Sequence, residues 1–269
     1  MTGPEVGLTP DPEANAFIDA YRERVRAVLD RDLIGLLVHG SIATGTFDAA
    51  SDIDIIAIIG QPLTGEQFAA LDAMHRALQQ LDTSWAIQLE VTYIPLASLR
   101  RYDPDDATHP HIDRGPGEQL KLKHFYEDWK IQRHLMREKG IMLFGPPPET
   151  VIDPVNQQEV REAAWGILQI WLEVLPDEIE AYEHRGAQSY AVLTLCRSLH
   201  TIATGLPASK KQSLDWAREA LAPRCKPLLD DAWDGRTNHQ SAVTPALRQE
   251  TMAFARYALS YGQGIMEAL

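Results

Sequence analysis

The sequence predicts an α+β protein with a sheet-containing half followed by an α-helical bundle. Two observations support this prediction. The first half alternates short β-branched segments with amphipathic ones, whereas every periodic segment from about Val155 onward has helical spacing. A chain of 269 residues also has room for two domains, so we expect a first domain at 1–155 and a second at 156–269.

The first half is predicted to run helix, strand, strand, helix, strand. The first helix follows from Phe17, Tyr21 and Val25, whose spacing of four places them on one apolar face. The strands are short apolar runs rich in Ile, Val and Leu. In chain order these five elements are expected at 14–30, 33–40, 52–60, 67–82 and 85–96.

The middle of the chain is predicted to hold one loop and one further helix. Residues 99–117 are dense in Pro, Gly, Asp and His, which is typical of loops. Residues 119–139 are expected to form a helix that stops at Gly140 before a short apolar strand and three prolines. In the second half, helical patterns cover 157–175, 189–205, 211–222 and 246–269.

The formal net charge of −13 argues against a protein that grips nucleic acid, because phosphate binding requires clustered Lys and Arg. An acidic surface suits a cationic small molecule better, although acidity also serves solubility alone. No segment reaches the roughly 18 apolar residues of a membrane helix, and the N-terminus lacks the pattern of a signal peptide. The two cysteines have no metal-ligand spacing. We expect a cytoplasmic monomer without a membrane or nucleic-acid partner.

Two carboxylates interrupt the second predicted strand. Asp52 and Asp54 project from one face of that strand because side chains alternate, while Ile53 points to the core. Two close carboxylates are costly to bury without a cation, and hard oxygen ligands select Mg²⁺. The alternative is that both acids face water at a sheet edge.

The loop before this strand favours the metal interpretation. Gly40 and Ser41 stand where the first strand ends, and a glycine turn with a serine hydroxyl can hold a phosphate. The order Gly-Ser, a loop with Gly45, then Ser-Asp-Ile-Asp resembles the nucleotidyltransferase superfamily. That superfamily requires a third carboxylate on a neighbouring strand. Glu90 is the acid in a strand-like context, unless it is merely an outward polar residue.

The similarity extends to a narrower family. The runs "GSIATGTFDAASDIDIIAII", "LEVTYIP", "HFYEDWKIQRHLMREKGIMLFGPPP" and "VLTLCRSLHTIATGLPASKKQSLDWAREAL" resemble the aminoglycoside (3'')(9) adenylyltransferases. The resemblance implies a polymerase-β-like nucleotidyltransferase domain with a mixed sheet, joined to a helical domain that closes on nucleotide and substrate. It also implies that Asp52, Asp54 and Glu90 are catalytic metal ligands, with Glu90 as the base.

The same resemblance assigns binding roles in the rest of the chain. Arg197 and Lys210 match positions that reach the nucleotide phosphates, although Lys211 could replace Lys210 in the alignment and either residue could be a solvated surface charge. Trp129 matches a tryptophan that contacts the drug, unless it is a core residue. Glu183 matches an acidic drug-binding position, within a stretch that aligns poorly.

The predicted function is therefore transfer of AMP from ATP, with two Mg²⁺ ions, to streptomycin, spectinomycin or both, which gives antibiotic resistance. Three alternatives stay open at this point. The fold could act on another small-molecule or protein acceptor, serve as a nucleotide sensor without turnover, or extend a nucleic acid. The acidic balance and the lack of a basic, aromatic-rich stripe disfavour the last of these.

Overall fold

The structure is a computed structural model that describes residues 7–48 and 50–269. The side chains of Glu178, Glu180 and Ala181 also lie outside the described part. The chain forms two compact units, of which the first ends at Pro154 and the second runs from Val155 to Leu269.

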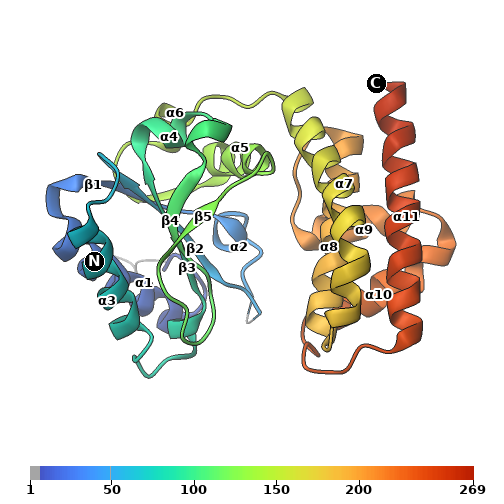
Figure 1. Cartoon of the computed structure of the whole chain (residues 1–269), viewed down its shortest axis with the longest axis horizontal. Coiled ribbons are helices and arrows are strands. Elements are labelled where there is room, and N and C mark those ends of the chain that lie inside the picture. The colour runs from blue at the N-terminus through green and yellow to red at the C-terminus, as the bar shows by residue number, and fades with distance from the viewer. Residues whose placement is uncertain (1–6, 49) are drawn as a thin grey trace, which may run out of the picture. The chain divides into compact units, whose positions relative to one another are not determined.

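The first unit is built on a mixed sheet, as predicted, and this sheet has six strands among the described residues (Figure 1). The spatial order is β5-β4-β3-β2-β1-β6. Only β2 and β3 pair in parallel among these neighbours, and the other four pairs are antiparallel. The strands are β1 (Leu33–Val38), β2 (Ile53–Ile59), β3 (Leu89–Pro95), β4 (Thr108–Ile112), β5 (Lys121–His124) and β6 (Ile141–Phe144).

Helices cover both faces of this sheet, and each face has its own apolar core (Figure 1). The longer helices α1 and α3 contribute to one core, and the group α4, α5 and α6 contributes to the other. Alternation along β2 explains the division, because Ile53 and Ile55 pack in the first core while Ile56 packs in the second. The helices are α1 (Pro12–Leu29), α2 (Gly40–Ala43), α3 (Gly65–Leu78), α4 (Leu96–Arg100), α5 (Trp129–Lys139) and α6 (Pro148–Val151).

Local sequence accounts for where the two longer helices of this unit begin. Asp11 caps α1, because its carboxylate accepts hydrogen bonds from the backbone N–H groups of Glu13 and Ala14. In α3, Thr64 and Gln67 form a reciprocal capping box. Such caps satisfy N–H groups that have no partner within a helix, so the sequence indicates where both helices begin.

The middle of the chain departs from the sequence prediction in two places. The predicted loop at 99–117 contains strand β4, and the predicted helix at 119–139 begins with strand β5 before α5 starts at Trp129. The two strands form a hairpin on β3, with Thr92 opposite His111 and His111 opposite Lys121. Pairing with a strand already in the sheet stabilises them, which local composition does not reveal.

The second unit is helical, as predicted. The helix α8 lies at its centre and packs against the other four helices. The helical periodicity of the sequence did not predict the short helix α10. Cys196 and Cys225 are buried free thiols. The five helices are α7 (Gln157–Ala181), α8 (Arg185–Thr204), α9 (Lys210–Ala220), α10 (Lys226–Asp234) and α11 (Pro245–Ala268).

None of the helices in the described part of the chain is both long and apolar enough to cross a membrane.

Candidate active site

The three predicted carboxylates lie together in the first unit. The parallel register of β2 and β3 sets Asp54 directly beside Glu90, and Asp52 stands two residues before Asp54. One oxygen from each of the three lies within 4.8 Å of the others, and all three residues are half-buried. Sheet pairing therefore brings together acids that are 36 residues apart in the chain.

The Gly40-Ser41 turn is in close contact with this cluster. Gly40 has a φ of +64°, and a Cβ at this position would lie only 1.9 Å from Asp54 Oδ2, so a side chain does not fit. The backbone N–H of His39 donates to the Asp54 carbonyl oxygen over 3.0 Å. Among the described residues, none hydrogen-bonds the buried Ser41 hydroxyl. The turn thus fixes Asp54 and leaves a donor for a ligand.

The carboxylate cluster fits a divalent cation. Its ligands are carboxylate oxygens, which Mg²⁺ prefers. Burial raises the pKa of Glu90, the Lys123 charge opposes that shift, and the Asp52 charge adds to it. A bound cation would relieve the repulsion between these acids. The residues present therefore suit the magnesium that the sequence predicted.

A second cluster, which the sequence analysis missed, adjoins the first through Glu90. The side chains of Glu90, His111 and Asp113 also bring ligand atoms within 4.8 Å of one another. Here, however, ammonium groups already bind the acid. Lys123 Nζ lies 2.8 Å from Asp113 Oδ1 and 3.0 Å from His111 Nε2, and Lys121 Nζ lies 2.8 Å from Asp113 Oδ2. These lysines make the second cluster a poor metal site.

The charges in this second cluster are set by burial and by the lysines. Burial and the nearby Lys123 lower the pKa of His111 to about 4, so its imidazole is neutral at pH 7. Burial alone would raise the pKa of Asp113, but hydrogen bonds from Lys121 and Lys123 hold it well below its usual range. The sequence contains a sign of the two strands that carry this cluster, because polar and apolar residues alternate in "HPHID" and "LKLKH", which is typical of strands.

Two predicted nucleotide contacts lie in the second unit. Arg197 is half-buried on α8, and Lys210 is the first residue of α9, which packs on α8. The Lys210 ammonium lies 5.7 Å from the centre of the Tyr190 ring. Because Tyr190 and Arg197 are seven residues apart on α8, they share one face of that helix.

The two predicted drug contacts differ in exposure. Glu183 is exposed just before α8 begins, where it is accessible to a solvent-borne cation. Trp129 is only 6% exposed, stacks on Phe125 with ring centres 4.2 Å apart, and belongs to the core around α5. This packing supports the core role that the sequence left as an alternative, although the indole N–H has no hydrogen-bond partner among the described residues, and the drug contact stays a prediction.

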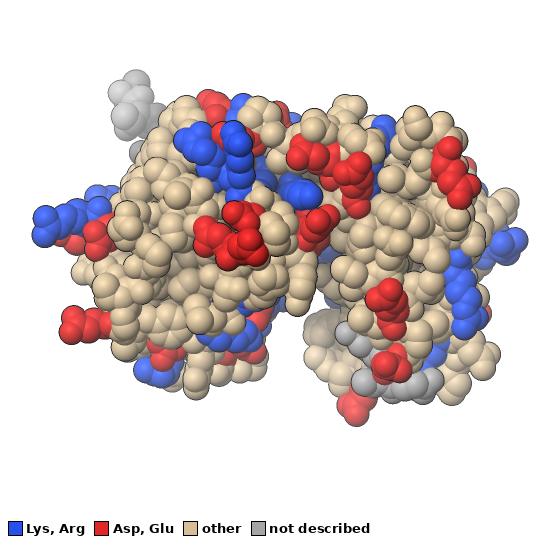
Figure 2. All heavy atoms as spheres, turned by 45° about the horizontal axis from the view of Figure 1, so that its top comes forward, with Lys and Arg blue, Asp and Glu red and all other residues tan. Residues whose placement is uncertain are grey.

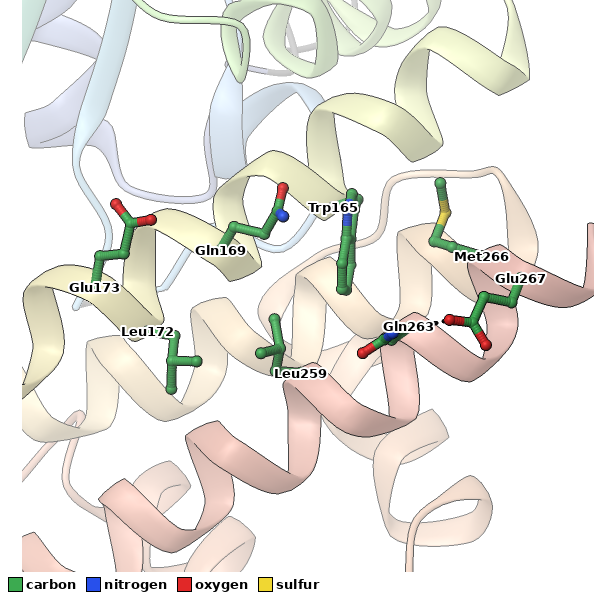
Figure 3. A pocket seen from close by; sticks show the side chains of 8 residues that line it. All are labelled: Trp165, Gln169, Leu172, Glu173, Leu259, Gln263, Met266 and Glu267. Atoms are coloured by element: carbon green, nitrogen blue, oxygen red, sulfur yellow. Dashed lines mark hydrogen bonds between the residues drawn. The ribbon is translucent and has the colours of Figure 1, made fainter.

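The second unit contains a groove of about 520 Å³ between α7 and α11 (Figure 3). None of the predicted site residues lines it. Apolar side chains form its floor, and amide and carboxylate groups rim it, with Gln263 Nε2 donating to Glu267 Oε1 over 2.8 Å. Its lining consists of Trp165, Gln169, Leu172, Glu173, Leu259, Gln263, Met266 and Glu267.

The charged side chains of both signs are interspersed on the face shown in Figure 2. Lys and Arg gather in small groups beside Asp and Glu and form no continuous basic stripe on that face.

Comparison with known proteins gives matches in both units. Residues 19–112 match the family described as nucleotidyltransferase domain, and residues 150–261 match the family described as aminoglycoside adenylyltransferase, C-terminal domain. A spectinomycin 9-adenylyltransferase of Staphylococcus aureus is 24% identical over 240 residues, which cover 87% of this chain and 89% of the relative. An aminoglycoside (3'')(9) adenylyltransferase of Klebsiella pneumoniae is 34% identical over 96 residues, 36% of this chain and 34% of the relative.

A solved structure shares the fold. The crystal structure of the spectinomycin adenyltransferase AAD(9) from Enterococcus faecialis, with ATP and spectinomycin, superimposes with a TM-score of 0.68 at 17% sequence identity. The alignment covers 91% of this chain and 98% of that one. With both family matches in chain order and the carboxylates assembled beside the Gly-Ser turn, the chain belongs to the aminoglycoside adenylyltransferase family of nucleotidyltransferases.

Proposed function

We propose that this enzyme transfers AMP from Mg-ATP to a hydroxyl of a cationic aminoglycoside-type antibiotic and releases pyrophosphate. The observation that carries the proposal is the meeting of Asp52, Asp54 and Glu90 within 4.8 Å. The S. aureus relative that aligns over most of this chain is named a spectinomycin 9-adenylyltransferase. The acceptor hydroxyl is then the 9-OH of spectinomycin, the 3''-OH of streptomycin, or both.

Each residue of the carboxylate cluster has a distinct role in this proposal. Asp52 and Asp54 hold the cations, and Glu90 takes the proton as the acceptor oxygen bonds to the α-phosphorus and the bond from that phosphorus to the pyrophosphate oxygen breaks. When bound, magnesium polarises the α-phosphoryl group and offsets charge on the leaving pyrophosphate. We propose two ions, as the sequence predicted.

The acceptor is proposed to be cationic because acidic groups precede α8. Glu183 is exposed there, and Asp177 near the end of α7 is exposed as well. Protonated amines of an antibiotic would be attracted to these carboxylates, and the attraction would weaken with salt over a screening length of roughly 8–10 Å. The two drugs differ in which hydroxyl accepts AMP, so they must be assayed separately.

Mass spectrometry of each drug after incubation with enzyme, ATP and Mg²⁺ tests the proposal. We expect spectinomycin, streptomycin or both to gain one adenylyl group, with no gain when Mg²⁺ is removed by chelation. If neither drug reacts but another hydroxylated acceptor does, the fold serves a different substrate. If ATP binds and no acceptor in a panel of antibiotics reacts, the protein is a nucleotide sensor and the proposal fails.

Gly40→Ala is expected to lower adenylyl transfer by about 100-fold, because the new Cβ would displace the Asp54 carboxylate and a shift of about 1 Å near reacting groups costs this much. Gly45→Ala is the matched control. Gly45 also has a positive φ, of +69°, but apart from its chain neighbours no atom of the described residues lies within 4 Å of the place that a Cβ would occupy there. Both variants should lose about 1–2 kcal/mol of stability to backbone strain. Equal activity of the two variants would contradict the role given to Gly40.

Arg197→Ala and Lys210→Ala are each expected to weaken ATP binding by about 10- to 100-fold, the worth of a charge-assisted contact to phosphate. Lys211→Ala is the matched control, because Lys211 follows Lys210 directly and is the alternative match in the sequence, and its ammonium forms an ion pair with Asp215. Calorimetric titration with ATP and Mg²⁺ measures the three affinities. If Lys211→Ala loses more ATP affinity than Lys210→Ala does, the predicted phosphate contact belongs to Lys211.

A further inference from the structure

A cationic side chain that the function does not yet use lies at the carboxylate cluster. Arg114 Nη1 is 3.2 Å from Asp52 Oδ2. Burial raises the pKa of Glu90, and the Arg114 charge is among the charges that oppose this rise, so the guanidinium acts on two of the three carboxylates. Arg114 follows β4 in the connection to β5, a segment that the sequence analysis interpreted as loop.

The backbone next to Arg114 is tethered. The N–H of Gly115 donates to the Ile87 carbonyl oxygen over 2.8 Å. Further along, the N–H of Gly117 donates to Gln79 Oε1 over 3.2 Å, and the N–H of Leu120 donates to Asp72 Oδ1 over 3.1 Å. Together these bonds attach the connection to α3 and to the segment before β3. The backbone at Arg114 is therefore held in a fixed position next to the carboxylate cluster.

The Arg114 side chain, in contrast, is free to change partner. It is 47% exposed, and among the described residues its ion pair is the one with Asp52. Exposed pairs of this kind are weak, so a stronger ligand can displace either member. The neighbouring Lys121 and Lys123 differ, because several contacts bind them to Asp113 and His111.

We propose that Arg114 occupies the cation position at Asp52 until metal and nucleotide bind, and that it then transfers to the nucleotide phosphates. A divalent cation at Asp52 would repel the guanidinium, whereas a triphosphate would attract it. The planar guanidinium suits this exchange, because it donates two parallel hydrogen bonds to carboxylate and phosphate alike. The inference rests on the proposed function, and it adds a phosphate ligand from the first unit.

Two titrations of opposite expected sign test this exchange. In Arg114→Met, Mn²⁺ or Mg²⁺ alone should bind about 1.5- to 5-fold more tightly, because a weak competing cation is gone. Mg²⁺ with the non-hydrolysable analogue α,β-methylene-ATP should bind about 10- to 100-fold more weakly, because a charged phosphate contact is lost. Arg114→Lys should fall between, since Lys keeps the charge without the paired donors.

The control is Arg22→Met, which removes one positive charge from an exposed ion pair on α1, where Arg22 lies 2.9 Å from Asp19. It should change neither affinity. Weaker binding in both titrations of Arg114→Met would show a structural role and overturn the inference. Unchanged binding in both would reduce Arg114 to a surface ion pair and overturn it as well. Failure of the wild-type protein to bind the analogue would instead refute the proposed function.

Discussion

Asp54→Asn is expected to reduce adenylyl transfer by about 10³-fold or more while the protein stays folded, and Asp52→Asn should behave alike. Metal stabilisation of the transition state is worth several kcal/mol, and an amide oxygen without charge supplies little of it. Asn has nearly the same shape as Asp, so the strand and the hydrogen bond from His39 N–H to the Asp54 carbonyl oxygen are preserved.

Three measurements on purified variants check this result. Steady-state rates give the loss of turnover, Mn²⁺ titration gives the loss of metal affinity, and thermal unfolding shows whether stability changed. Asp19→Asn, on the surface of α1, is the control for the substitution itself. Asp113→Asn separates the two carboxylate clusters, because we expect it to leave Mn²⁺ affinity within about twofold of wild type. More than a tenth of wild-type activity in Asp54→Asn would refute the metal assignment.

Glu90→Gln is expected to bind Mg-ATP and yet transfer AMP about 10²- to 10⁴-fold more slowly, the usual contribution of a general base. Burial raises the pKa of Glu90. In the wild-type enzyme the rate should fall as the pH falls through the pKa of Glu90 in the metal-loaded site, because a protonated carboxyl cannot accept the hydroxyl proton. The residual rate of Glu90→Gln should not show this decrease at low pH.

Calorimetry and a pH–rate profile decide the role of Glu90. If Glu90→Gln keeps its affinity for ATP but loses its rate of AMP transfer, Glu90 is the general base. If Glu90→Gln loses ATP affinity together with turnover, Glu90 is chiefly a metal ligand and another group takes the proton. Glu118→Gln provides a control carboxylate, because Glu118 lies in the connection between β4 and β5, where it pairs with the exposed Lys121, and its loss should leave both the rate and the profile unchanged.

Short-range patterns in the sequence were enough to predict the strand with the proposed metal-binding aspartates and the turn before it. Alternation along residues 52–60 places Asp52 and Asp54 on one face whatever the rest of the chain does. The glycine requirement at Gly40 was also local in origin, because the chain reverses there after a buried strand. The helical second half followed from periodicity, since the apolar faces of α7, α8 and α11 are long enough to show it.

Long-range pairing decided what the sequence alone left open. Glu90 was selected as the acid in a strand-like context, but its position beside Asp54 depends on the register between β2 and β3, which no local pattern encodes. His111 was passed over because strands of four or five residues rich in His, Lys and Pro resemble a loop, and Asp113 and Arg114 follow directly in the connection after β4. The segments of β4 and β5 become strands only by hydrogen bonding to a sheet that is already buried.

Packing likewise bears on the two interpretations of Trp129 and supports the core one, while its drug contact stays a prediction. A tryptophan at helical spacing looks the same in sequence whether it faces a core or a ligand. In the fold, its indole stacks on Phe125 and lies among apolar side chains. The sequence by itself thus determined the residue types for metal and phosphate binding and their local spacing. Tertiary structure alone determined which charges meet, because contact between distant residues depends on strand register and on burial against other elements.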